Sequence, residues 1–128
     1  MESPFTSKLP QVQEIWQADF ALICPEGDSP WLAWVTWPDS DLILARDLTE
    51  QEPVSDWLWL TVVKAMRHPA VGEPRRPTRL HARSHQLWRP LATAFKVIGV
   101  ALVERDQLMP VDGVPEMLDE FYQERCHD

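Results

Sequence analysis

The segment WLAWVTW, residues 31–37, constrains the fold more than any other part of the chain. Its β-branched and aromatic residues favour a strand. In a strand, successive side chains point to opposite faces, so indoles lie on both faces of this one: Trp31, Ala33, Val35 and Trp37 on one, Leu32, Trp34 and Thr36 on the other. Because indoles on both faces need cover, we expect a sheet that is packed on both sides.

Two further strand signals flank this segment. Residues 15–23 (IWQADFALI) are rich in aromatic and aliphatic side chains and end in the turn 25–30 (PEGDSP). Residues 38–41 (PDSD) form a tight turn into a third apolar stretch, residues 42–46 (LILAR). The short connections predict an antiparallel meander of three strands.

Helix and strand signals alternate after this meander. Ser55 is the expected N-cap of a helix over 56–67, followed by a proline-rich loop, a strand over 78–83 and a second helix that begins at or after Ser84. Residues 100–103 then predict a short buried strand. Pro115 suits the first turn of a last helix.

The resulting order is β-β-β-α-β-α-β-α, which predicts an α/β (α+β) fold. A meander that continues into two crossover connections gives a five-stranded mixed sheet with helices on both faces. The 128 residues fit one domain. We expect an extended N-terminal lead-in over 1–14 and a single domain over 15–126.

Charge and cysteine content limit the classes of partner and the compartment. The net charge is −8, and the segments 1–63, 64–96 and 97–128 carry −9, +7 and −6. An acidic chain of this kind is not typical of a nucleic-acid binder. Cys24 and Cys126 form no CxxC pair, and we expect free thiols in a reducing cytoplasm. The sequence contains neither a signal-peptide pattern nor an apolar run long enough for a membrane span, so we expect a soluble, cytoplasmic protein.

The order of elements resembles the ribonuclease H-like fold shared by nucleases, transposases and retroviral-type integrases. The stretch WQADF, residues 16–20, looks like the first-strand motif of integrase-type enzymes, in which the aspartate binds a metal. The stretches GEPRRPTRLHARS (72–84) and IGVALVERDQL (98–108) are similar to an uncharacterised bacterial domain family frequent in cyanobacteria. That second resemblance implies no known activity, but it suggests a role in assembling photosynthetic or carboxysome machinery.

The resemblance implies an incomplete catalytic set. Two-metal nucleases need several convergent carboxylates, and Asp19 fills the first-strand position. After the fourth strand, where such a fold carries an aspartate, the chain has Arg83 and Ser84. The alternative is a metal-dependent nuclease, or a nucleic-acid-binding remnant of one, that uses Asp19 with Asp119 or Glu120 of the last helix. We expect no enzyme activity, no metal and no cofactor; the chain also has no glycine-rich nucleotide loop.

The seven tryptophans are the best functional lead, because a core of this size cannot easily enclose them all. Exposed aromatic and arginine side chains are typical of protein-binding sites. We therefore predict a non-catalytic protein-binding or assembly factor that holds an extended or helical segment of a partner protein in an apolar groove. The groove is made of Trp31, Trp37, Trp57 and Trp59 and is rimmed by Arg75, Arg76 and Arg79. Two points stay open: the arginines could instead pair with internal acids, and a homodimer interface could cover the tryptophans.

Overall fold

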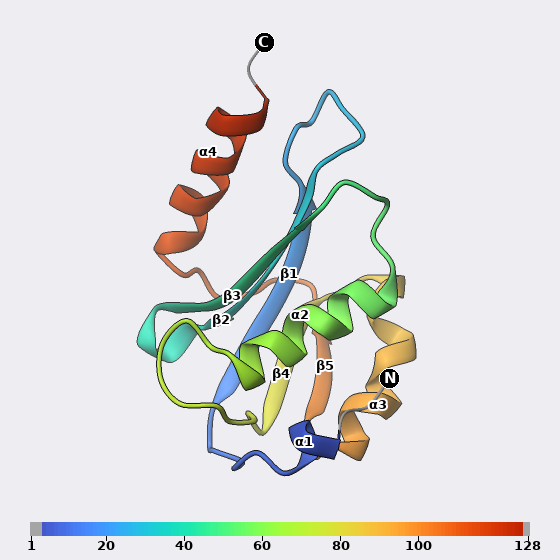
Figure 1. Cartoon of the computed structure of the whole chain (residues 1–128), viewed down its shortest axis with the longest axis vertical. Coiled ribbons are helices and arrows are strands. Elements are labelled where there is room, and N and C mark those ends of the chain that lie inside the picture. Colours follow the sequence, from blue (N-terminus) through green and yellow to red (C-terminus); the bar gives the residue numbers. More distant parts are fainter. Residues whose placement is uncertain (1–3, 127–128) are drawn as a thin grey trace.

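The structure is a computed structural model that describes residues 4–126 as a sheet flanked by helices (Figure 1). The five strands are β1 (Ile15–Leu22), β2 (Trp31–Trp37), β3 (Leu42–Thr49), β4 (Arg79–Arg83) and β5 (Ala101–Arg105). The α-helices are α1 (Pro4–Ser7), α2 (Ser55–Arg67), α3 (Ala92–Val97) and α4 (Gly113–Arg125), and the 3-10 helices are η1 (Pro38–Ser40) and η2 (Gln86–Leu91).

The strands form one mixed sheet in the order β3-β2-β1-β4-β5. The meander β1–β2–β3 is antiparallel, while β4 pairs with β1 and β5 with β4 in parallel. The predicted five-stranded mixed sheet is therefore confirmed. In this order β1 is central, and β4 pairs with its first half, from Ile15 opposite Arg79 to Ala18 opposite Ala82.

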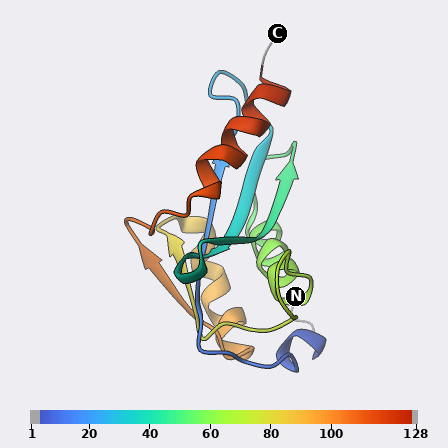
Figure 2. The same cartoon turned by 90° about the vertical axis from the view of Figure 1, so that its left-hand side faces the viewer.

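The two faces of the sheet are covered by different helices, as Figures 1 and 2 show. On one face, α2 and α3 bury a core that contains Trp16, Trp59 and Phe95. On the other face, α4 packs over Leu32 and Trp34 through Met117. The alternation along β2 places Val35 in the first core and Trp34 in the second, as the sequence predicts.

Several local predictions are corrected. Ser55 is the first residue of α2 rather than its N-cap; Val54 is the cap, and the Ser55 hydroxyl donates to the Leu87 carbonyl at 2.6 Å. The second helix begins as η2, because Pro90 cannot donate the backbone hydrogen bond of an α-helix. The part of the expected lead-in that the structure describes, residues 4–14, contacts the sheet domain: Thr6 is fully buried and Gln11 bridges to Arg76.

The prediction of free thiols is wrong. Cys24 and Cys126 form a disulfide across 102 residues of sequence, with their Cα atoms 5.4 Å apart. They meet because α4 runs back across the sheet and ends above the turn that follows β1. The expectation of a cytoplasmic location was based partly on free thiols. It loses that support, because disulfides persist mainly in oxidising compartments. Within residues 4–126, no helix is both long enough and apolar enough to span a membrane.

Candidate functional site

An ion pair occupies the position where the resemblance implies a metal site. Arg83 Nε donates to Asp19 Oδ2 at 2.9 Å, and the second oxygen, Asp19 Oδ1, accepts the Phe20 N–H at 2.9 Å. Arg83 Nη1 also donates to the Asp106 carbonyl at 3.2 Å. The parallel pairing sets Ala18 opposite Ala82, so the next residues, Asp19 in the middle of β1 and Arg83 at the end of β4, lie side by side on one face of the sheet. Asp19 is 9% exposed, and its negative charge is balanced by the guanidinium.

The other two acids of the alternative metal site, Asp119 and Glu120, are exposed on α4. The side of α4 that faces Asp19 is apolar and carries Val114 and Leu118, which line a cavity of about 320 Å³ between helix and sheet. Asp19 and Arg83 lie in the wall of this cavity. Among residues 4–126, no three His, Cys, Asp or Glu side chains are grouped closely enough to hold a metal ion.

A groove lined by aromatic rings lies at the same end of the sheet, on the side of α2. Phe20 is its centre: its ring centroid is 5.0 Å from that of His85, 6.1 Å from that of Trp31 and 6.5 Å from that of Trp57. Phe20, Trp31 and Trp57 are half-buried and His85 is exposed. We call Phe20, Trp31 and His85 the aromatic groove, because adjoining depressions of about 160 and 190 Å³ share these three residues.

The rim of the aromatic groove is acidic beside Trp31, while Arg83, paired with Asp19, lines one of its two depressions. A third depression of about 400 Å³ extends from Trp31 and is lined by Asp28, Glu50 and Glu52. Glu52 also lines the neighbouring depression, with Leu87 as its apolar wall. The Trp31 ring is held in place by its Nε1–H, which donates to the Asp28 carbonyl at 3.0 Å. The groove therefore combines a fixed indole, an apolar wall and a negative rim.

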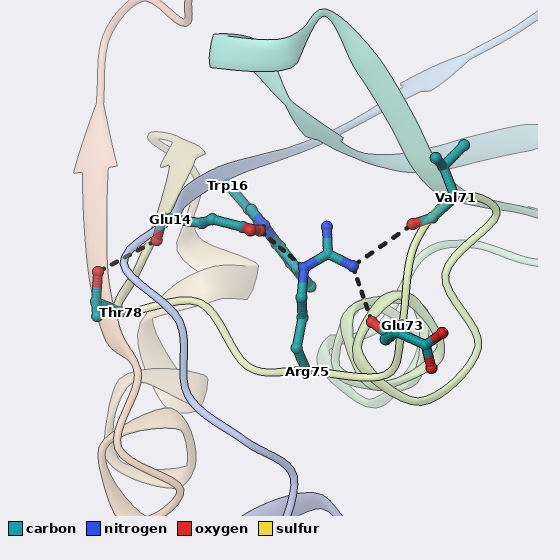
Figure 3. Close-up of polar contacts among 6 residues, drawn as sticks. All are labelled: Glu14, Trp16, Val71, Glu73, Arg75 and Thr78. Carbon is teal, nitrogen blue, oxygen red and sulfur yellow. Dashed lines mark hydrogen bonds and ion pairs between the residues drawn. The ribbon is translucent and has the colours of Figure 1, made fainter.

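Arg75 lies at the opposite end of the sheet and is part of the fold. Its Nε donates to Glu14 Oε1 at 2.9 Å, its Nη1 donates to the Glu73 carbonyl at 2.8 Å, and a longer bond reaches the Val71 carbonyl, as Figure 3 shows. Trp16 Nε1 donates to the same Glu14 oxygen at 2.9 Å. The side chain of Arg75 is only 9% exposed, so its guanidinium forms an internal ion pair with Glu14.

The predicted groove is therefore split between the two ends of the sheet. Trp37 lies with Arg75, whose Cζ is 5.4 Å from its ring centroid, at the far end of β2 from Trp31. Trp59 is 2% exposed and packs on Phe95 in the core, with ring centroids 4.8 Å apart.

The remaining rim arginines also lie away from the aromatic groove. Arg76 donates to the carbonyls of Leu9 and Ile98. Arg79 is exposed at the start of β4. Of the predicted set, the structure brings only Trp31 and Trp57 together, with Phe20 between them. Trp31 and Trp37 lie apart because they are the two terminal residues of β2, which is seven residues long.

The sequence-based reasoning missed Phe20, His85 and the acidic rim. Phe20 follows Asp19 directly, so strand alternation already turns it to the opposite face, toward the predicted first helix. His85 gives no such signal. It is the N-cap of η2, and its Nδ1 accepts the Leu87 N–H at 3.0 Å.

No protein-family model and no curated protein sequence matches the chain. Among solved structures, the catalytic core domain of BIV integrase is similar with a TM-score of 0.57 at 14% identity, over 91% of this chain and 76% of that one. A chain of the simian T-cell lymphotropic virus intasome, solved in complex with PP2A regulatory subunit B56 gamma, is similar with a TM-score of 0.62 at 15% identity. That match covers 91% of this chain but only 42% of the viral chain. The sheet and its helices thus have the ribonuclease H-like fold of integrase catalytic core domains.

Proposed function

We propose that this chain is a non-catalytic ribonuclease H-like domain that binds a cationic, partly apolar segment of another protein in the aromatic groove. The observation that carries the proposal is the half-buried ring of Trp31, which is fixed by its hydrogen bond to Asp28 and lines a depression together with Glu50 and Glu52. An indole face attracts lysine and arginine side chains, and the acidic rim adds charge complementarity. An assembly role of the kind that the second resemblance suggests would use this groove to hold the partner.

The ion pair between Asp19 and Arg83 supports the non-catalytic part of the proposal. A guanidinium in contact with the carboxylate repels a divalent cation and occupies one of the two oxygens that would bind it. Two-metal catalysis also needs further carboxylates close by, and the exposed acids of α4 point elsewhere.

The test measures peptide binding by fluorescence anisotropy. A capped twelve-residue peptide that alternates arginine and leucine should bind, whereas the peptide that alternates glutamate and leucine should not. Trp31→Ala should weaken binding by about 30-fold, the effect of losing a 2 kcal/mol hot spot. Trp37→Ala is the matched control, because Trp37 is also a half-buried indole, at the other end of the same strand. Equal binding of the two peptides, or equal effects of the two variants, contradicts the proposal.

A second candidate function is nucleic-acid binding by a remnant of the nuclease fold. It is favoured by the similarity to integrase cores and by three arginines on the uncovered face of β4 and β5, namely Arg79, Arg83 and Arg105. Labelled duplex DNA at low salt should then bind, with a salt dependence that is reduced in Arg105→Glu. A metal-dependent form of this candidate further requires that Mg²⁺ raise the melting temperature of the wild type but not of Asp19→Asn. Absence of DNA binding at 50 mM salt, about the lowest ionic strength in common use, excludes this candidate.

A further inference from the structure

Helix α4 is attached to the sheet differently at its two ends. Before its first turn, the Gln17 side chain forms two hydrogen bonds with the backbone of Met109, of 2.7 and 2.9 Å. Asp41 Oδ1 accepts the Asp112 N–H at 2.8 Å. These three bonds fix the start of the helix without the help of the disulfide.

The far end of α4 is joined to the turn after β1 by the bond between Cys24 and Cys126. Met117 is the one residue of α4 that is fully buried, and Leu118 and Phe121 are half-buried. Tyr122 is 38% exposed, and the last turn is otherwise polar. Besides the disulfide, this end is attached by the packing of Leu118 and Phe121 and by Arg46, whose Cζ lies 5.2 Å from the Phe121 ring centroid. The hydrophobic contribution scales with the area buried, which is small for these half-buried side chains.

The surface beneath this end of α4 is strongly apolar. Leu32 is fully buried, Ile23 is 6% exposed and Trp34 is 8% exposed, all in the cluster that α4 covers. If the end of α4 moved away, these side chains would meet water or a partner. Exposed apolar patches of this kind are typical of interaction sites.

We infer that the Cys24–Cys126 pair is a site of reversible thiol–disulfide exchange that fastens α4 over this face of the sheet. Cys126 is half-buried whereas Cys24 is 8% exposed, so an external thiolate reaches Cys126 first. Its attack on Cys126 Sγ forms a mixed disulfide and releases Cys24 as a thiolate. A second thiolate then attacks the external sulfur, which frees Cys126 and leaves the external disulfide. Two external thiols thereby supply the two electrons that the protein sulfurs accept.

In the reduced state, the three bonds at Met109 and Asp112 keep the start of α4 in place while its last turns leave the sheet. The exposed face then contains Ile23, Leu32 and Trp34. In the oxidised state, α4 covers this face.

Hydrogen exchange followed by mass spectrometry, on the full chain with and without dithiothreitol, tests this inference. Alkylation with iodoacetamide should modify neither cysteine before reduction and both after it. On reduction, amides of residues 117–126 should exchange at least about tenfold faster, while those of β1 and β2 stay protected. Cys126→Ser should reproduce this pattern without reductant, and binding of an apolar dye should rise in parallel.

Three results would overturn the inference. Two alkylated cysteines in the chain purified under air would show that the disulfide does not form. Unchanged exchange over 117–126 after both thiols are free would show that the bond does not fasten α4. Faster exchange in β1 and β2 as well would show that the bond stabilises the whole fold and does not control one helix.

Discussion

Arg75 provides the sharpest test of whether the basic cluster is structural. Replacing it with methionine keeps the length of the side chain but removes the guanidinium that contacts Glu14 Oε1 at 2.9 Å and the Glu73 carbonyl at 2.8 Å. It also removes the cation from the rings of Trp16 and Trp37, each 5.4 Å from Arg75 Cζ. The Glu14 carboxylate would keep only the Trp16 N–H as a side-chain donor.

The expected loss is large because both partners are shielded from water. The side chains of Arg75 and Glu14 are 9% and 15% exposed, and removing one partner of such a pair costs about 3–5 kcal/mol. Glu14→Gln should cost less, about 1.5–3 kcal/mol, since its amide oxygen can still accept both hydrogen bonds. The loss in the double variant should fall short of the sum by about 1–3 kcal/mol, the coupling expected of residues in direct contact.

Equilibrium unfolding in urea measures these differences. Arg79→Met is the matched control: this arginine is exposed only four residues further along, and its replacement should change the free energy of unfolding by less than about 0.5 kcal/mol. If Arg75→Met lowers the free energy of unfolding by less than about 1 kcal/mol, the structural role is refuted, because replacing a surface side chain has an effect of similar size.

Three further predictions concern stability. The pKa of His81 lies below its usual value because of partial burial and the charges of Arg105 and Arg79, so the unfolded chain binds more protons. The free energy of unfolding, measured in urea, should therefore fall as the pH drops below about 6.5. The fall should be less steep in His81→Gln. Gly72→Ala should destabilise the fold, because Gly72 has φ +86° and its added Cβ would lie 2.8 Å from Arg75 Nη1; a melting temperature equal to that of the wild type would contradict this. Trp59→Ala should cost about 3–5 kcal/mol in chemical denaturation, whereas Trp31→Ala at the half-buried groove should cost clearly less.

The candidate site could be predicted only in part. Asp19 and Arg83 stand out because the resemblance places Asp19 on the first strand and Arg83 where an aspartate is expected after the fourth, and the structure joins them in an ion pair. A tryptophan groove was predicted because tryptophan is unusually frequent, and of its four indoles only Trp31 lines the aromatic groove. Which indoles stay accessible depends on what packs against them: α2 turns Trp59 into the core and leaves Trp57 half-buried beside Phe20.

The sequence by itself determined the order of the elements, the mixed sheet and the need to cover both faces of β2. These follow from short-range patterns, because strand alternation, helix periodicity and turn residues act over a few positions. Only the tertiary structure decided the partners of the charged and sulfur-bearing side chains. Arg75 meets Glu14 across 61 residues, Arg83 meets Asp19 across 64, and Cys24 meets Cys126 across 102. Such contacts depend on strand register and on where α4 crosses the sheet, and no local pattern in the chain encodes either.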